Sequence, residues 1–166
     1  DYNLSTGNLT IGASGGLDAT SAASIVTVAL SFTDSSNRFT EGSSELKMTG
    51  TGNLDSGGDL YNLTITGTVT KTSANNMLVT SHLDIQLGGN LSTGATCGSM
   101  RHSGGAGTNL TIAGTLSGSC AFWQISATEP TISITGTVAF PTTSIELVYQ
   151  YSNAASIYTI PAFTTN

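Results

Sequence analysis

The chain is poor in charge, proline, cysteine and aromatic residues. Its 166 residues include four Lys and Arg, ten Asp and Glu, three Pro, two Cys and one Trp. The net charge of −6 leaves no basic stripe to neutralise phosphates, which argues against nucleic acid as a partner. No run approaches the roughly 18 apolar residues that a membrane-spanning helix needs, so we expect no membrane insertion. No signal peptide is visible at Asp1, and we expect either a processed mature form or a piece of a longer protein.

Small residues account for a large part of the composition. The chain has 28 Thr, 22 Ser and 20 Gly, and 38% of its residues are apolar, which is enough to bury one core in a single domain. Apolar residues seldom recur at helical spacing. Instead, β-branched residues alternate with small polar ones in short bursts such as Asn62-Leu63-Thr64-Ile65. The sequence therefore predicts an all-β protein.

The chain contains internal repeats. Leu-Thr-Ile occurs at residues 9–11, 63–65 and 110–112, and Ile-Thr-Gly-Thr-Val at 65–69 and 134–138. Apolar anchors about 20 residues apart extend these strings into a series: Ile11, Val28, Met48, Ile65, Ile85, Ile112 and Ile134. The residue two before each anchor is aliphatic and the residue one before it is polar, as in a strand that buries one face.

Glycine and asparagine follow the anchors, where they permit the backbone to turn a corner, as in Gly50-Thr51-Gly52-Asn53. A period near 20 with short strands predicts a parallel β-helix, or β-solenoid, of about seven coils over residues 1–141, with like side chains stacked in columns. An antiparallel β-sandwich or jelly roll is the alternative. It would explain the strand spacing, but not the shared phase of successive repeats.

The stretch Phe39-Thr40-Glu41-Gly42-Ser43-Ser44-Glu45-Leu46, together with Leu60-Tyr61-Asn62-Leu63-Thr64-Ile65-Thr66-Gly67-Thr68, resembles repeats of large microbial cell-surface proteins of the β-helix adhesin type. The resemblance covers roughly residues 8–140 and supports architecture more than function. It implies a secreted or surface-displayed stalk, adhesin or appendage component without catalytic residues.

The last residues depart from the repeat pattern. Residues 142–166 concentrate four aromatic side chains, those of Tyr149, Tyr151, Tyr158 and Phe163. Because the open end of a solenoid exposes core and unpaired strand groups, we expect this segment to be a C-terminal cap or the final, irregular coils. The alternative is an interaction element that docks on the next subunit by strand addition.

The two cysteines, Cys97 and Cys120, lie 23 residues apart, which is about one coil. Adjacent coils are about 4.8 Å apart, within the usual Cα separation of a disulfide of about 4.4–6.8 Å. We therefore expect a disulfide between neighbouring coils and an oxidising compartment; two separate buried thiols are the alternative.

The chain shows no catalytic or phosphate-binding motif, so we expect no enzymatic activity and no cofactor. Paired carboxylates, Glu41 with Glu45 and Asp55 with Asp59, are weak calcium candidates, but solvated loop carboxylates explain them more simply. A metal site is not expected, because His82 stands alone in its strand and His102 has no spaced partner set. The four cations, Arg38, Lys47, Lys71 and Arg101, do not cluster as a lyase acting on acidic sugars would need.

Five Asn-Leu-Ser/Thr sequons are candidate glycosylation sites: Asn3, Asn8, Asn62, Asn90 and Asn109. Since three of them, Asn8, Asn62 and Asn109, are expected at the same repeat position, they could also be residues that the repeat itself requires. Trp123 is the one residue suited to stacking on a sugar ring if it is exposed, and burial is its alternative fate.

These features together predict a non-catalytic extracellular structural protein, a subunit of a cell-surface filament or stalk that contacts identical copies head to tail. The alternatives are a carbohydrate-binding adhesin that contacts surface glycans or a phage or virus fibre module, and, more distantly, a polysaccharide-degrading β-helix enzyme.

Overall fold

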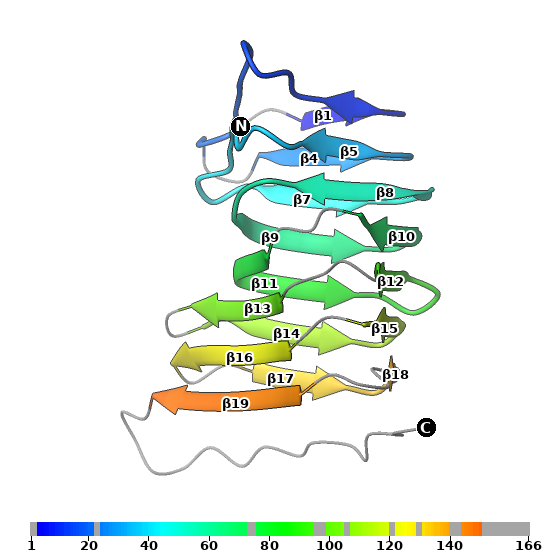
Figure 1. The fold of residues 1–166 in the computed structure, drawn as a ribbon, viewed down its shortest axis with the longest axis vertical. Coiled ribbons are helices and arrows are strands. Elements are labelled where there is room, and N and C mark those ends of the chain that lie inside the picture. Colours follow the sequence, from blue (N-terminus) through cyan, green and yellow to red (C-terminus); the bar gives the residue numbers. More distant parts are fainter. Residues whose placement is uncertain are drawn as a thin grey trace.

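In a computed structural model, strands alone make up the regular structure of the described chain, and they stack into a parallel β-solenoid of about five turns (Figure 1). The structure describes residues 3–21, 24–72, 76–94, 99–104, 107–119, 122–128, 131–139 and 144–150, with backbone only for 122–128 and 144–150. Every strand pair among them is parallel. This topology rules out the antiparallel sandwich.

Each coil contributes strands to up to three faces, which we call the first, second and third face in the order in which the chain meets them. The first face stacks β1 (Asn3–Thr6), β4 (Ile25–Val28), β7 (Glu45–Met48), β9 (Leu60–Ile65), β11 (Met77–Ile85), β14 (Asn109–Ile112) and β17 (Thr131–Ile134).

The second face stacks β2 (Leu9–Thr10), β5 (Phe32–Asp34), β8 (Thr51–Ser56), β10 (Thr68–Lys71), β12 (Asn90–Thr93), β15 (Thr115–Gly118) and β18 (Thr137–Ala139). The third face holds β3 (Leu17–Asp18) with β6 (Phe39–Thr40), and further along the stack β13 (Ser99–Gly104), β16 (Phe122–Thr128) and β19 (Ser144–Gln150), which continue from the first half of β11. β1 and β19 lie at opposite ends of the stack (Figure 1).

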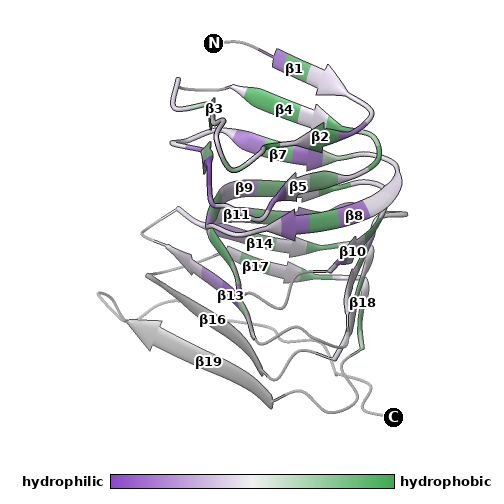
Figure 2. Ribbon diagram, turned by 45° about the horizontal axis from the view of Figure 1, so that its top comes forward, coloured by the Kyte–Doolittle hydropathy of each residue, from purple (hydrophilic) through white to green (hydrophobic). Residues whose placement is uncertain are grey.

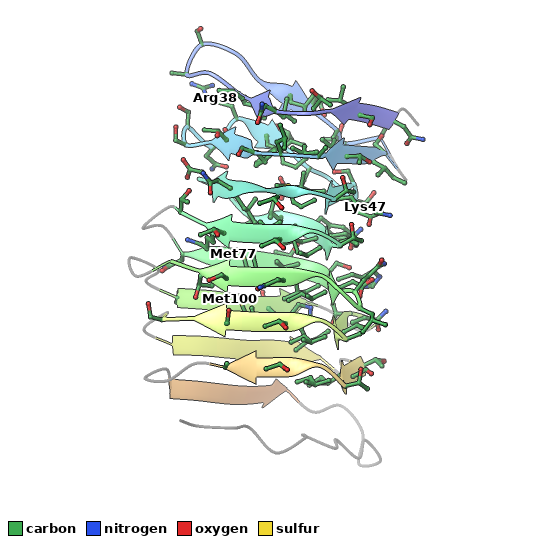
Figure 3. All side chains as sticks on the ribbon, turned by 90° about the vertical axis from the view of Figure 1, so that its right-hand side faces the viewer. Arg38, Lys47, Met77 and Met100 are labelled. Atoms are coloured by element: carbon green, nitrogen blue, oxygen red, sulfur yellow. The ribbon has the colours of Figure 1, made fainter. Side chains whose placement is uncertain are left out.

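Aliphatic columns form the core, and hydrophobic and hydrophilic residues alternate along the strands (Figure 2). On the first face, Leu63 pairs with Leu83, Leu83 with Leu110 and Leu110 with Ile132. The three leucines are buried and Ile132 packs against them half-buried. The predicted inner column is therefore confirmed. On the third face, Met77 lies directly above Met100 in the same way (Figure 3).

One repeat was assigned to the wrong face by the sequence. Leu9 and Thr10 pair with Phe32 and Thr33 on the second face, whereas the first rung of the first face is Asn3–Thr6. The series of first-face anchors therefore begins at Thr6 and not at Ile11. The string Asn-Leu-Thr-Ile suits any half-buried strand, so the local pattern cannot distinguish two faces of one coil.

Glycines form a column at the corner between the first and second faces. A Cβ atom added to Gly67, Gly114 or Gly136 would collide with the backbone of the preceding coil. A buried carboxylate organises another turn, because Asp34 accepts hydrogen bonds from the backbone N–H groups of Arg38 and Phe39 at 2.8 Å each. These corners have no room for side chains or need a local acceptor, which explains the Gly-rich and Asn/Asp-rich segments.

The solenoid continues beyond the expected boundary at residue 141. β19, Ser144–Gln150, pairs with β16 over seven residues, including Tyr149 opposite Ala127. The expected cap or docking segment, residues 142–166, thus contains a strand of the stack. Tyr151, Tyr158 and Phe163 lie outside the described residues.

Candidate functional site

A polar depression of about 260 Å³ lies on the outer side of the first face. Its lining comes from four consecutive rungs: Glu45, Asn62, Thr64, His82, Leu83, Asp84, Asn109 and Thr111. On each rung the polar lining residues stand next to a core-facing leucine. Because successive side chains of a strand point to opposite faces, these polar side chains lie on the outer side of the sheet. The depression is thus a product of strand alternation and not of a loop.

Strand register sorts the lining residues into two outward columns. Asn62 pairs with Glu45 on one side and with His82 on the other, and His82 pairs with Asn109; we call these four residues the outer amide column. Two positions further along each strand, Lys47, Thr64, Asp84 and Thr111 are aligned in the same way, and we call them the outer hydroxyl column. Lys47 projects from the outer edge of the stack (Figure 3).

Side chains of the outer amide column bond to the backbone of the following coil. The Oδ1 atom of Asn62 accepts a hydrogen bond from the backbone N–H of His82 at 3.2 Å, where the ladder between β9 and β11 is irregular. In the next coil, the Nδ1 atom of His82 accepts from the backbone N–H of Asn109, also at 3.2 Å. Because a backbone N–H can only donate, the neutral imidazole must carry its proton on Nε2. These two hydrogen bonds orient the side chains of Asn62 and His82.

The depression carries two carboxylates, Glu45 and Asp84, and one of them is positioned by a neighbour. The Nε2 atom of Gln86 donates to Oδ2 of Asp84 at 3.0 Å, which leaves Oδ1 as a further acceptor. Lys47, on the same strand as Glu45, supplies the nearby cation of the outer hydroxyl column. The site thus combines fixed acceptors, an imidazole donor and threonine hydroxyls.

Two of the weak calcium candidates, Glu41 and Asp59, lie close enough to influence each other, a combination that the sequence did not predict. Glu45 belongs to the depression, whereas Glu41 is influenced by Asp59 and Asp34. Burial raises the pKa of Glu41, and the negative charges of Asp59 and Asp34 raise it further. Within the described ranges, no three His, Cys, Asp or Glu side chains gather closely enough to hold a metal ion.

Besides Asp34, two ionisable side chains of the described residues are buried in the solenoid. His102, on β13, is fully buried, and its Nε2 atom lies 2.8 Å from the carbonyl oxygen of Ser81. Burial lowers the pKa of His102, so the ring is held neutral. Lys71, only 2% exposed, has the same strand parity as buried Val69; burial lowers its pKa and the charge of Asp55 opposes that shift.

The five sequons occupy three different settings. Asn3 and Asn8 are exposed, at the first coil, whereas the others are half-buried. Asn3, Asn62 and Asn109 share the outer amide position of the first face, while Asn8 precedes the second-face strand β2 and Asn90 begins β12. The expected equivalence of Asn8 with Asn62 and Asn109 is therefore wrong, because Asn8 belongs to another face.

Several predicted site residues fall where the structure gives no side chain. Cys97 and Cys120 lie outside the described residues, so their disulfide stays a prediction. Trp123 is part of β16 and pairs with Met100 through the backbone, but its side chain is not described.

The sequence did not predict the depression itself. Its members appeared separately, as sequons, as a calcium candidate or as a lone histidine. Aligning the residue before each inner leucine would have brought Glu45, Asn62, His82 and Asn109 into one column.

Comparison with known proteins adds no relative: no protein-family model, no curated protein and no solved structure matches this chain. The described part of the chain contains no helix of the length and apolar character needed to cross a membrane. The function must be argued from the residues and the geometry alone.

Proposed function

We propose that the chain is a non-catalytic, extracellular structural protein, a subunit of a cell-surface filament or stalk. The proposal rests on the parallel stack, in which each coil uses its backbone groups and its aliphatic columns to bind the next. Such a stack transmits the same pattern of hydrogen bonds and apolar contacts from coil to coil, and nothing in the pattern limits its length.

The head-to-tail contact is supported by the outer strands and half-buried leucines of the first coil. β1, β2 and β3 are each the outermost strand of their sheet among the described residues. Leu4, Leu9 and Leu17 on these strands are half-buried, whereas their partners one coil further, Val26, Phe32 and Phe39, are buried. A coil placed on this end would pair three strand edges and cover the three leucines at once. We propose that a copy of the same chain provides that coil.

We also propose that the solenoid has seven coils, the number that the sequence series predicts. The support is the set of seven in-register rungs that the described residues form on the first face, from β1 to β17, and seven on the second. Of the five sequons, we propose Asn3 and Asn8 as the glycosylated ones, because they are exposed and the other three are not. Tyr151, Tyr158 and Phe163 lie outside the described residues, so their contact with a next subunit stays a prediction.

A matched pair of variants at the first coil tests the filament. Leu17→Lys places a charge on the apolar end, whereas Thr10→Lys places the same charge on the exposed outer side of the same coil. We expect the unmodified protein and Thr10→Lys to form fibres under negative stain, and Leu17→Lys to remain as dispersed particles with β-rich circular dichroism. Fibres of Leu17→Lys, or an unmodified protein that stays monomeric at high concentration, would contradict the proposal.

The second candidate function is a carbohydrate-binding adhesin. The observation that favours it is the polar depression on the first face, because planar polar side chains on a rigid sheet suit sugar hydroxyls. A degradative enzyme is a weaker candidate. If Glu41 or Asp59 had a catalytic role, Glu41→Gln or Asp59→Asn would abolish sugar release from a polysaccharide, and we expect no such release from the unmodified protein.

A further inference from the structure

The depression lies in the middle of a sheet face and not at an edge. The backbone groups beneath it are used between coils: the N–H of Glu45 donates to Ser24 O at 3.0 Å and that of Asn62 to Ser44 O at 3.3 Å. A ligand here cannot add a strand, because no edge is available. It must be recognised by side chains alone.

The side chains that remain for a ligand are mostly polar and already oriented. His82 presents an Nε2–H donor, since its Nδ1 accepts the N–H of Asn109. Asp84 retains an acceptor oxygen beside the one that Gln86 holds. Leu83, the single apolar residue in the lining, is buried in the core. The depression offers several hydrogen-bonding groups, and the carbon atoms of the same polar side chains supply the apolar part of its surface, a combination that suits the hydroxyl groups and the C–H faces of sugars.

Charge narrows the class of sugar. Glu45 and Asp84 place two carboxylates in the depression, and Lys47 on the neighbouring column supplies one cation. An acidic polysaccharide would bring its own carboxylates against them, and like charges at short range are unfavourable. Hydroxyl groups, by contrast, can donate to the carboxylates and accept from the imidazole. We propose that the depression binds an extended glycan of uncharged sugars.

The dimensions fit a segment of a longer polymer. Four stacked rungs span about 14 Å at the usual strand spacing of about 4.8 Å, and the spacing of the rungs is close to the length of one sugar unit in an extended glycan. The volume of about 260 Å³ lies just below the roughly 300 Å³ at which pockets for drug-sized ligands begin. A glycan that runs along the stack would therefore meet polar groups at each coil, although their chemistry differs from rung to rung.

This inference deepens the second candidate function and does not depend on filament formation. Affinity electrophoresis of the full chain through gels containing galactomannan, dextran or polygalacturonate tests it. We expect at least one of the two neutral polymers to retard the protein and polygalacturonate not to do so. Retardation by neither neutral polymer, or stronger retardation by polygalacturonate, would overturn the proposal.

Variants locate the binding. Glu45→Gln and Asp84→Asn each keep the shape of the side chain and remove its charge, and each should weaken the interaction about tenfold. Asp59→Asn removes a carboxylate that is exposed outside the depression and serves as the matched control.

Thr111→Val extends the test to an uncharged group and is compared with Thr115→Val on the second face. Circular dichroism confirms that each variant is folded. Equal retardation of the depression variants and their controls would place the glycan elsewhere. Failure of fibre formation with intact glycan binding would contradict only the filament proposal, and loss of glycan binding in intact fibres only this one.

Discussion

The glycine column at the corner between the first and second faces gives the sharpest test of the stacking. In Gly67→Ala, the new Cβ would lie 2.6 Å from the backbone nitrogen of Gly50 and 2.7 Å from its carbonyl carbon, and closer still to its oxygen. Such atoms cannot approach within about 3.0 Å without movement of the backbone. Since all three of these Gly50 atoms belong to the main chain, no side-chain rotation relieves the clash.

The energetic effect follows from the hydrogen bonds at this corner. The N–H of Thr66 donates to Met48 O at 2.9 Å, the N–H of Gly67 donates to the same oxygen at 3.3 Å, and Gly67 O accepts from Asn90 N–H at 2.8 Å. Separating the coils strains all three. At about 1 kcal/mol net for each hydrogen bond, we expect the free energy of unfolding to fall by about 2–3 kcal/mol. This is a large fraction of the roughly 5–15 kcal/mol by which domains are stable.

Gly12→Ala is the matched control. No heavy atom lies within 4 Å of a Cβ placed on Gly12, and its backbone is not in the left-handed region. The same chemical change there should be neutral or stabilising by about 0.4–1 kcal/mol, because alanine reduces the entropy of the unfolded chain. Urea denaturation followed by circular dichroism measures both.

Comparing the stability of Gly67→Ala with that of Gly12→Ala shows whether a loss comes from the contact between coils or from the substitution itself. If Gly67→Ala were as stable as the unmodified protein, the corner contacts between coils would be wrong. If both variants lost the same stability, the loss would not come from stacking. Gly114→Ala, which meets the backbone of Gly89, should repeat the effect two corners further along the stack.

Three other measurements test the core column, the buried histidine and the predicted disulfide. Leu83→Asp places an unpaired charge in the core and should cost more than about 3 kcal/mol, whereas Thr111→Asp on the outer side should cost less than about 1 kcal/mol; equal losses in urea denaturation would contradict the column. Burial lowers the pKa of His102 below its ordinary 6.5. As the pH falls, the unfolded chain therefore binds a proton at this residue before the native protein does. Stability should be complete above about pH 6.5 and decline as the pH falls towards the native pKa, and His102→Gln should reduce that decline. Mass spectrometry of unreduced digests should show Cys97 linked to Cys120, and quantitative thiol labelling of the native protein would refute that bond.

The sequence was sufficient for the fold class and for most of the core. An aliphatic residue two positions before another, with a polar residue between, indicates a strand with one buried face wherever it occurs. The recurrence of that pattern in one phase indicates parallel stacking, since each coil must bury the same side against its neighbours. This is why Leu63, Leu83 and Leu110 were correctly placed in one column.

The same local pattern could not assign a strand to a face. Leu9-Thr10-Ile11 has the inside and outside order of Leu63-Thr64-Ile65, yet it begins the second face. Which face a strand joins depends on how many residues the previous corner uses, and that number varies: successive first-face rungs are 17 to 27 residues apart. Only pairing with the next coil fixes it.

The polar depression shows the same division. The sequence alone determined that Asn62, His82 and Asp84 face away from the core, because each stands beside an inner leucine. Tertiary structure alone decided that they meet Glu45 and Asn109, residues 17 before and 47 after Asn62, and that Glu41 is instead influenced by Asp59. Strand alternation is a property of two or three neighbouring residues, so it can be detected in the chain itself. Proximity across coils depends on register and on corner length, which are set by hydrogen bonds between segments about 20 residues apart.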